Sequence, residues 1–398
     1  MAAASWSELP RDLLRLIANC LDTYTDEVRF ACVCTSWRSI LLTIGRSHPW
    51  CLLSPEETNE KYDKYNRLYE KYEHFYCLYE KKFHYLEVSN RFRGSSHGWL
   101  VSTDEDSPRI YLFSPFTKVQ ISLPPRYMFP DVRKFCEENE LEPYDDGCIG
   151  TAFCVHRGFL EKVILSSSPS KANCMVAAIC GRKCNYLAYC KLGDESWTCI
   201  VKGMMGYDDA TFDHEQKLLY AVTFTNHVHV FDLFGSPKLI DTIEPPLSQI
   251  EGKLLNRYLV KTSMGLLQVQ RHLSLQCEWE DQTYDCYQTS FFNLYMFEPS
   301  SLSWCKVGNI GENVLFLGQN SSISIASSCL HGYKGNQIYF IDRLLVFDMV
   351  RVRGERYDIG VYNLDSTSVQ SLQRSDIKRY RSPTPIWYIH SPEDFFEQ

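Results

Sequence analysis

WSELPRDLLRLIANCLDTYTDEVRFACVCTSWRSILL, residues 6–42, is the stretch that decides how this chain begins to fold. Pro10 suits a first helical turn, because its missing N–H would be unpaired there in any case. The apolar residues after it recur at helical spacing and share an arc of about 100°. They are Leu13, Leu14, Ile17 and Leu21. The pattern predicts a short amphipathic helix.

A second helical pattern follows a polar turn. Thr25 and Asp26 are candidate caps, and Glu27 favours a helix N-terminus through the helix dipole. If this helix continues, a second apolar arc of about 100° forms. It contains Phe30, Val33, Cys34, Trp37, Leu41 and Ile44. So small a unit cannot bury two such stripes by itself, so either the rest of the chain or a partner must cover one of them.

These residues resemble the F-box. The resemblance rests on Leu9-Pro10, Asp12 to Leu14, Ile17, Leu21, Arg29-Phe30, Val33-Cys34 and Trp37-Arg38. It implies that the unit docks on a Skp-family adaptor, which links it to a cullin–RING ubiquitin ligase. The adaptor-binding anchors that it implies are Leu9, Pro10, Leu13, Leu14, Ile17, Leu21, Val33 and Trp37. The turn from Asp22 to Asp26 is longer than in the general F-box, which leaves the register of the second helix open.

Composition limits the remaining possibilities. The 398 residues are 44% hydrophobic and 23% charged, as in ordinary globular proteins. The net charge of −8 argues against a general nucleic-acid binder, and no apolar run approaches the roughly 18 residues of a membrane span. The start, MAAASW, does not resemble a signal peptide, and the 17 cysteines have no regular spacing. We therefore expect reduced thiols, no zinc, and a location in the cytoplasm and/or nucleus.

The segment after the helical unit is charged and rich in tyrosine. A stripe from Tyr62 to Leu86 follows heptad spacing, which is typical of a coiled-coil helix. The competing interpretation is a β-hairpin formed by Phe75 to Tyr79 and Phe83 to Val88. We favour a helix or loose linker over Glu56 to Glu73, followed by the hairpin. The expected domains are thus 1–50 (F-box), 51–74 (linker or helix) and 75–398 (β domain).

From Gly98 onward, short strands alternate with regular breaks. The expected strands are Trp99–Val101, Ile110–Phe113, Val119–Ile121, Lys162–Leu165, Cys174–Cys180, Tyr186–Cys190, Lys217–Thr223, His227–Leu233, Lys238–Ile243, Tyr258–Thr262, Leu266–Arg271, Phe291–Phe297, Ile338–Ile341 and Ile359–Tyr362. So many strands favour a β-propeller, in which radial repetition leaves few exposed edges. We expect about six blades, with Ile386 to Ile389 closing the ring against an N-terminal strand. Phe129 to Tyr144 is a charged insertion that could form a helix.

This region resembles the KIB-type propeller of plant F-box proteins. The resemblance rests on Gly98 to Val101, Leu112 to Thr117, Leu123 to Pro125, Trp304, Val307, Leu315 to Gly318, Asn336 to Phe340, Asp342 and Asp358 to Tyr362. The expected fold class is therefore mainly β, with a small N-terminal all-α F-box followed by a propeller of about six blades.

The sequence offers little chemistry. It contains no phosphate-binding glycine loop and no His-Glu-x-x-His pair. Cys174, Cys180 and Cys190 suit small buried hydrophobes better than zinc ligands. We interpret the acidic pairs Asp208-Asp209 and Glu137-Glu138 as solvated. Trp197, Trp279, Trp304 and Trp387 fit blade cores, and His227 and His229 fit surface or hydrogen-bonded positions. No cofactor is expected.

Two classes of function remain. The first is a non-catalytic substrate receptor of a ubiquitin ligase, whose F-box binds the adaptor and whose propeller binds an unknown protein substrate. The second is a propeller enzyme with a helical cap, which needs convergent carboxylates, a metal or a cofactor. An F-box scaffold that acts outside any ligase is a further alternative. The N-terminal motif favours the first class.

Overall fold

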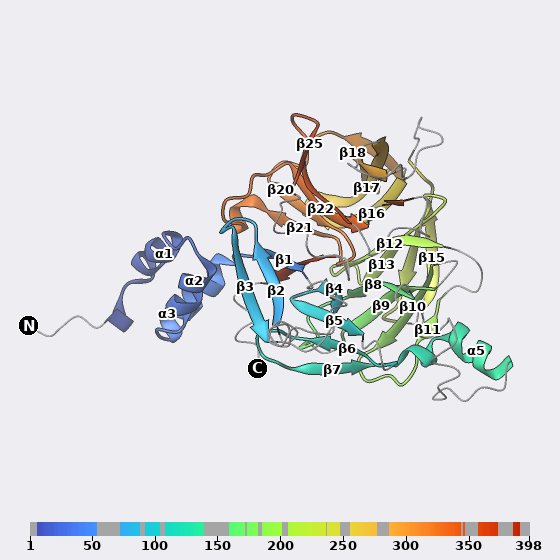
Figure 1. The fold of residues 1–398 in the computed structure, drawn as a ribbon, viewed down its shortest axis with the longest axis horizontal. Helices are drawn as coiled ribbons and strands as arrows, with labels where there is room; N and C mark the ends of the chain where they lie inside the picture. The colour runs from blue at the N-terminus through green and yellow to red at the C-terminus, as the bar shows by residue number, and fades with distance from the viewer. Residues whose placement is uncertain are drawn as a thin grey trace, which may run out of the picture.

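The computed structural model describes residues 6–53, 72–87, 92–103, 108–138, 159–171, 173–181, 185–200, 206–235, 237–246, 255–276, 286–343, 345–346, 357–372 and 385–390. Within these ranges, a small helical unit leads into six β-sheets arranged around a ring (Figure 1). The expected fold class, mainly β with a helical F-box unit and a six-bladed propeller, is confirmed. No helix in the described ranges is both long and apolar enough to cross a membrane.

The helical unit contains one short 3₁₀ turn and three helices: η1 (Trp6–Glu8), α1 (Arg11–Asn19), α2 (Tyr24–Ala31) and α3 (Thr35–Ile44). Helix α1 starts after Pro10, as expected. The N-cap of α2 is Thr23, whose hydroxyl accepts a hydrogen bond from the Asp26 amide at 3.2 Å. The expectation that Thr25 or Asp26 caps this helix was therefore wrong. Thr23 takes that position because its backbone is extended, which aims the hydroxyl at the first turn.

The second apolar stripe is divided between two helices. Helix α2 ends before Cys32, and α3 begins only after Cys34, which is extended. Gly45 then ends α3 in the left-handed conformation, at φ +64°, which glycine adopts without steric cost. The break turns α3 back so that it packs against both α1 and α2.

Each blade is a mainly antiparallel sheet. Blade 1 consists of β4 (Phe92–Ser96), β5 (Trp99–Thr103), β6 (Ile110–Phe113) and β7 (Gln120–Leu123). Blade 2 consists of β8 (Leu160–Leu165), β9 (Met175–Cys180), β10 (Tyr186–Lys191) and β11 (Thr198–Cys199). Blade 3 consists of β12 (Tyr207–Asp213), β13 (Leu218–Thr223), β14 (Val228–Asp232) and β15 (Lys238–Ile243). Blade 4 consists of β16 (Leu255–Thr262), β17 (Gly265–Gln276), β18 (Cys286–Glu298) and β19 (Ser303–Val307), with β23 (Leu345–Val346) beside β18. Blade 5 consists of β20 (Asn313–Leu317), β21 (Ile323–Ala326), β22 (Gln337–Arg343), β24 (Tyr357–Asn363) and β25 (Ser368–Ser371).

Blade 6 closes the ring by joining both ends of the chain. Its strands are β26 (Ile386–His390), β1 (His48–Leu53), β2 (Tyr72–Cys77) and β3 (Lys82–Glu87), in that spatial order. Trp50 of β1 lies opposite Tyr388 of β26, which confirms the expected closure by residues near 386–389. The hairpin expected after residue 75 is also confirmed as β2 and β3.

The domain boundary differs from the expected one. The propeller includes β1, so it starts at His48 rather than at residue 75. Because the run from His48 to Leu53 is short, its start was assigned to the end of the helical domain. Every one of its residues is buried in the sheet of blade 6. The expected linker or helix over 51–74 lies largely outside the described residues. The insertion after Phe129 does contain a helix, α5 (Pro130–Glu138), preceded by η2 (Arg126–Met128).

Apolar side chains fill the spaces between neighbouring sheets. Trp197 and Trp387 are buried there, as are Cys174, Cys180 and Cys190, which confirms these positions as core. Trp304 is half-buried, and Trp279 lies outside the described residues. His229 is buried and lies 2.8 Å from the Tyr207 hydroxyl, as expected of a hydrogen-bonded histidine.

Candidate functional site

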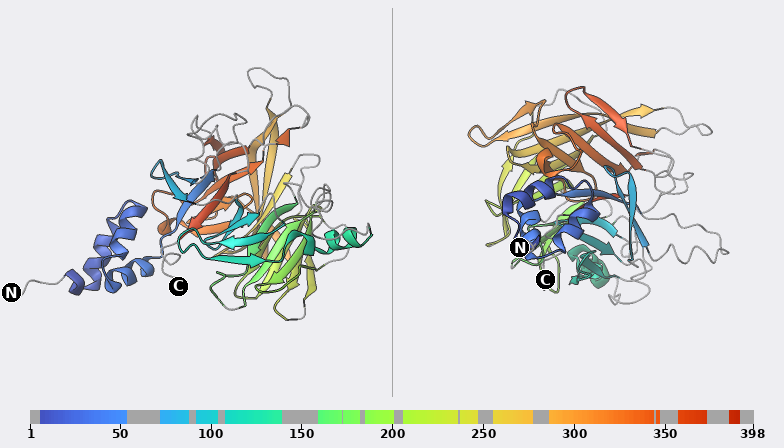
Figure 2. Two further views of the ribbon diagram at one scale, coloured as in Figure 1. Left: turned by 60° about the horizontal axis from the view of Figure 1, so that its bottom comes forward. Right: turned by 90° about the vertical axis from the view of Figure 1, so that its left-hand side faces the viewer.

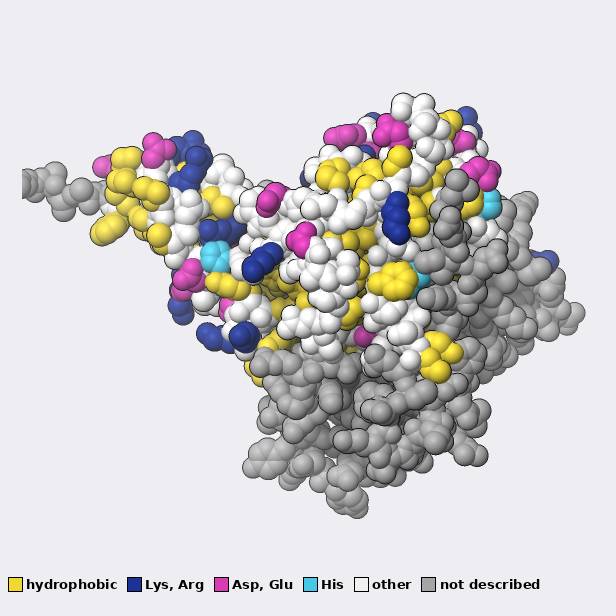
Figure 3. All heavy atoms as spheres, turned by 90° about the horizontal axis from the view of Figure 1, so that it is seen from above, with side chains coloured by type: hydrophobic (Ala, Val, Ile, Leu, Met, Phe, Trp, Pro, Cys, Tyr) yellow, Lys and Arg dark blue, Asp and Glu magenta, His cyan; other side chains and the backbone are white. Residues whose placement is uncertain are grey.

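The helical unit exposes a group of large apolar side chains. Trp6, Leu13, Leu16 and Val33 are 70%, 48%, 62% and 53% exposed, and Pro10 is exposed beside them. Figure 3 shows apolar side chains gathered on this unit, where it extends from the propeller. Exposed leucine and tryptophan side chains on so small a unit are typical of a surface that binds another protein.

The predicted anchors divide into three groups. Leu13, Pro10 and Val33 are exposed and available to a partner. Half-buried side chains pack on the core of the unit: Leu9, Ile17, Leu21 and Trp37. Leu14 is fully buried in that core, together with Ala18, Phe30, Ala31, Ile40 and Leu41. Leu14 therefore supports the exposed surface from beneath and cannot contact a partner in this conformation.

Two exposed residues were missed by the sequence analysis. Leu16 follows Leu13 by three positions, which places it about 60° away on the side opposite Leu14. Trp6 lies in η1, and its carbonyl oxygen accepts a hydrogen bond from the Trp37 indole at 3.0 Å. The Phe30 ring lies 4.5 Å from the Trp37 ring, so this bond ties η1 to the helical core. The helical spacing of Leu13 and Leu16 was a signal that could have identified Leu16.

A buried ion network connects the helices to the propeller. The Glu27 carboxylate lies 2.7 Å from the Arg46 guanidinium and 2.6 Å from the His48 imidazole. Arg46 also donates to the carbonyl oxygens of Ala18 and Leu21, at 3.2 and 3.1 Å, which satisfies the end of α1. Burial alone would raise the pKa of Glu27, but the hydrogen bonds from His48 and Arg46 outweigh burial and lower this pKa.

Tyr24 is the main apolar contact across the same junction. Its ring lies among aromatic side chains of blade 6 and of the β6–β7 turn: His48, Trp50, His84, Phe116 and His390. The Tyr24 amide donates to Glu80 at 3.0 Å. At the edge of the junction, the Ser47 amide donates to the Cys329 carbonyl at 2.8 Å. The helical unit is thus fixed against the rim of the propeller, from which it projects (Figure 2).

The centre of the ring contains charged residues that are fully engaged. Lys162 of β8 lies 2.6 Å from Asp209 of β12, and both side chains are buried. Asp209 also accepts hydrogen bonds from Ser322 at 2.6 Å and from the Leu259 amide at 3.1 Å. The expectation that Asp208 and Asp209 are solvated was wrong, because their strand is the innermost one of blade 3 and leaves the two side chains only 18% and 0% exposed.

A second charged cluster joins blades 3, 4 and 5. Asp208 pairs with Arg257 at 2.8 Å, and Arg271 pairs with Asp358 at 2.7 Å and with Asp342 at 3.1 Å. Burial raises the pKa of Asp208 to about 6, although Arg257 opposes the shift. Each carboxylate has a cationic partner, so this cluster is suited to holding blades together. Among the described residues, no group of three or more His, Cys, Asp or Glu side chains could hold a metal ion.

Comparisons with known proteins agree with this architecture. Residues 6–46 match the F-box domain, and residues 75–363 match the family described as KIB1-4 beta-propeller. The chain is 25% identical to the F-box protein SKIP23 of Arabidopsis thaliana, over 96% of this chain and 95% of that one. It is 23% identical to the putative F-box protein At5g55150 of the same plant, over 86% of each chain.

A solved structure is similar only at a distance. The Cps50 (Swd1) beta-propeller domain of Myceliophteria thermophila covers 81% of this chain, and 88% of that chain is covered. The sequence identity is 7% and the TM-score is 0.34, so this similarity adds nothing to the description of the fold.

Proposed function

This chain belongs to the KIB1-4 beta-propeller family and carries an N-terminal F-box, a combination that generally serves substrate recognition in SCF-type ubiquitin ligases, and from this premise we propose its specific role. The F-box binds a Skp-family adaptor, and the propeller binds a protein that is to be ubiquitinated. F-box proteins are generally non-catalytic. The chain would increase the local concentration of substrate at the ligase and would perform no bond chemistry itself.

The exposed apolar group on the F-box carries this proposal. Leu13, Leu16, Val33 and Trp6 lie on a unit whose own core is already filled by Leu14 and its neighbours. Their exposure is not needed to complete that core, so a partner is the simplest explanation for it. Protein interfaces concentrate their binding energy in a few such side chains. Truncating one of them costs about 2 kcal/mol or more of binding free energy.

The junction supports a receptor role as well. Tyr24 and the Glu27–Arg46–His48 network hold the F-box in one orientation on blade 6. A receptor needs such an orientation, because a substrate bound to the propeller must face the rest of the ligase. The same geometry does not require a catalytic centre on the propeller.

The enzyme alternative receives less support from the ring. Asp208, with its raised pKa, is the carboxylate that most resembles a catalytic acid or base. It is bound to Arg257, however, and Asp209 is bound to Lys162. Paired carboxylates of this kind are typical of structural bridges between blades.

We place the protein in the cytoplasm or nucleus, where adaptor and ligase would meet it.

The proposal is tested by adaptor binding of the full-length chain. Recombinant Skp-family adaptor should bind the parent, and Leu13→Ala/Leu16→Ala should weaken binding by roughly a thousandfold if the two effects add. Leu239→Ala/Ile240→Ala is the matched control, since both side chains are comparably exposed on β15 in blade 3. If the parent does not bind the adaptor, the proposed function fails. Reconstituted ubiquitin transfer to captured proteins separates a ligase receptor from a ligase-independent scaffold.

A further inference from the structure

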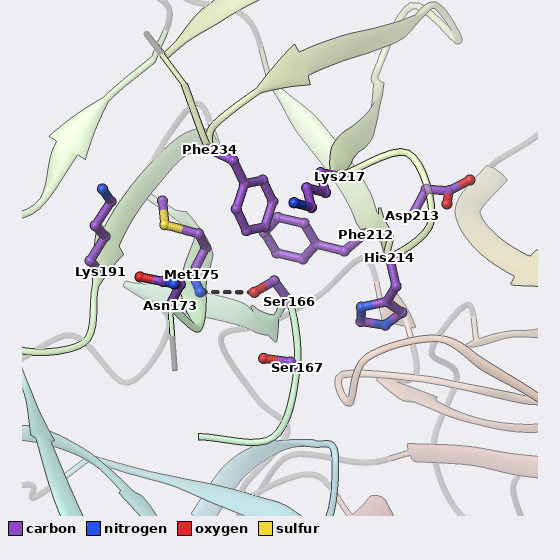
Figure 4. Close-up of a pocket in the computed structure, with 10 residues that line it drawn as sticks. All are labelled: Ser166, Ser167, Asn173, Met175, Lys191, Phe212, Asp213, His214, Lys217 and Phe234. Carbon is purple, nitrogen blue, oxygen red and sulfur yellow. Dashed lines mark hydrogen bonds between the residues drawn. The ribbon is translucent and has the colours of Figure 1, made fainter. Parts of the chain in front are cut away.

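A recess opens between blades 2 and 3, which are not neighbours of blade 6, the blade that carries the F-box. Its volume is about 450 Å³, and its walls come from the β8–β9 turn, the end of β10, the β12–β13 turn and the loop after β14 (Figure 4). The β8–β9 and β12–β13 turns join the first and second strands of their blades, and the loop after β14 joins a third strand to a fourth. The turn at Glu80, against which the F-box packs, joins the third and fourth strands of blade 6. Turns between first and second strands and turns between third and fourth strands emerge on the same face of a propeller. The recess therefore opens on the face where the F-box is attached.

The middle of the recess is aromatic. The rings of Phe212 and Phe234 lie 6.4 Å apart in an edge-to-face arrangement, with Met175 beside them. Figure 4 shows both rings between Lys191 on one side and His214 on the other. Phe212 is buried, whereas Phe234 is partly exposed and can pack against an incoming side chain. Such a surface suits one apolar or aromatic side chain.

The rim of the recess is cationic. Lys191 and Lys217 are exposed, and within the described residues no carboxylate lies within ion-pair distance of either ammonium group. Asp213 also lines the recess, but it is bound to Lys261 at 2.5 Å, and in Figure 4 its carboxylate points away from the aromatic rings. The Asp213 charge is thus neutralised, while the two lysine charges remain available.

Two neighbouring carboxylates accept hydrogen bonds from backbone amides of the loops. Asp232 accepts hydrogen bonds from the amides of Phe234 and Gly235, at 2.9 and 3.1 Å. Asp194 accepts from the Lys191 amide at 2.8 Å. These two carboxylates stabilise turns and do not line the recess, whose charged lining residues are Lys191, Lys217 and the Asp213 that is paired with Lys261.

The recess continues towards the centre of the ring. A second cavity of about 200 Å³ shares Phe212 and His214 with it. This cavity is lined by hydroxyl groups, including those of Ser95 and Ser322, and by Asn320. The Asn320 side-chain oxygen is buried and has no hydrogen-bond partner in the described part of the chain. The Ser95 and Ser322 hydroxyls already donate to the Trp387 carbonyl and to Asp209, so this cavity enlarges the recess without adding a free donor from these two residues.

We propose that this recess binds an acidic segment of the substrate protein. Carboxylates of the segment would pair with Lys191 and Lys217, and an apolar side chain between them would pack on Phe212 and Phe234. The inference rests on the proposed function, since it names the class of substrate that the receptor would take. A free peptide and a segment of a folded protein present the same chemistry, so a defined peptide is a suitable probe.

The test measures binding of a fluorescein-labelled Glu-Glu-Phe-Glu-Glu peptide to the full-length chain by fluorescence anisotropy. Lys191→Glu/Lys217→Glu should weaken binding by roughly tenfold or more, and added salt should weaken the parent's binding. Arg133→Glu/Lys306→Glu is the matched control, because it makes the same change of charge on exposed residues of α5 and β19 and should bind like the parent. Replacing the central Phe of the peptide by Ala should also weaken binding. Equal affinities of the parent and Lys191→Glu/Lys217→Glu would overturn the proposal.

Adaptor binding is measured on the same preparations. The Lys191→Glu/Lys217→Glu variant should bind the adaptor like the parent, and its melting temperature should match that of the parent, which shows that the propeller is folded. A parent that binds the adaptor but not the peptide would refute the recess as an acidic-segment site and leave the receptor function standing. A parent that binds the peptide but not the adaptor would refute the receptor function and leave the recess standing.

Discussion

The ring of Tyr24, in helix α2 of the F-box, packs edge-on against the indole of Trp50, in strand β1 of the propeller. Their centroids lie 4.9 Å apart at an interplanar angle of 80°. His390 lies 4.7 Å from the same tyrosine ring, so Tyr24 touches both of the strands that close the propeller. One side chain of the F-box therefore joins the unit to the point where the ring closes. The orientation of the F-box is consequently coupled to the integrity of blade 6.

Tyr24→Ala should loosen this junction. Removing a buried aromatic side chain costs about 3–5 kcal/mol, and here the loss falls on contacts between the F-box and blade 6. Hydrogen exchange of α2 and β1 in the full-length chain should accelerate, and a protease should separate the F-box from the propeller sooner. Tyr24→Phe retains the ring and should behave like the parent. Unchanged exchange in Tyr24→Ala would show that the junction does not depend on this ring.

The junction should also weaken in mild acid. Burial lowers the pKa of His390 well below its ordinary value of 6.5, and the neighbouring His48 and His84 lower it further. The unfolded chain then binds a proton more readily than the folded one. The contribution of His390 to stability is complete above about pH 6.5 and is lost as the pH falls, by up to about 1.4 kcal/mol per pH unit. The Glu80 carboxylate lies 3.4 Å from the His84 imidazole. It raises the pKa of His84 and so partly offsets the lowering of that pKa by burial.

The measurement is the melting temperature of the full-length chain between pH 7.5 and 5.5. Glu27 does not contribute to the decline in this range, because its pKa is lowered from 4.5 and its contribution is lost only in stronger acid. His390→Phe should reduce the pH dependence between these values without abolishing it, because burial also lowers the pKa of His74, His97 and His229. An equally steep decline in His390→Phe would assign the effect to other groups.

The sequence predicted most strands and the closure of the ring, but it missed β1, β4, β11, β12, β19, β20, β21, β23 and β25. Two of these, β4 and β12, share a physical cause. Strands β4 (Phe92–Ser96) and β12 (Tyr207–Asp213) were not expected, and both are innermost strands of their blades. Such strands line the polar centre of the ring, so they carry serine and aspartate where a blade strand normally alternates apolar residues. Asp209 looked solvated for the same reason. Its partner Lys162 is 47 residues away in the sequence, and no local pattern connects them.

The candidate site was predictable only in part. The helical period places Leu13 and Leu14 within one arc, but it does not say which edge of the arc faces inward. That depends on where α3 packs, which brings Ile40 and Leu41 against Leu14 and leaves Leu13 exposed. The recess between blades 2 and 3 was not predictable at all, because Lys191, Phe212 and Phe234 come from three separate strands or loops.

The Lys162–Asp209 pair should be essential to the stability of the ring. Lys162→Met leaves the Asp209 carboxylate buried without its cation, which costs about 3–5 kcal/mol. Lys261→Met is the comparison, since the Lys261 side chain is 32% exposed and the amides of Glu215 and Gln216 still bond to the Asp213 carboxylate, so the loss should be smaller than for Lys162→Met. Guanidinium unfolding of the full-length variants measures both losses. Similar losses for the two variants would mean that burial does not decide the value of the pair.

Leu14 and Leu13 should affect adaptor binding by different routes. Leu14→Ala creates a cavity in the F-box core and should lower the stability of that unit by about 2–5 kcal/mol. Its adaptor binding should fall only because the F-box unfolds, so cooling should restore part of it. Leu13→Ala, at a half-exposed position, should leave the melting of the F-box unchanged and still weaken binding at every temperature. Melting followed by far-ultraviolet circular dichroism, together with adaptor affinity at two temperatures, distinguishes these routes. If Leu14→Ala remained folded and lost affinity as Leu13→Ala does, Leu14 would contact the adaptor directly, which would require the F-box to open on binding.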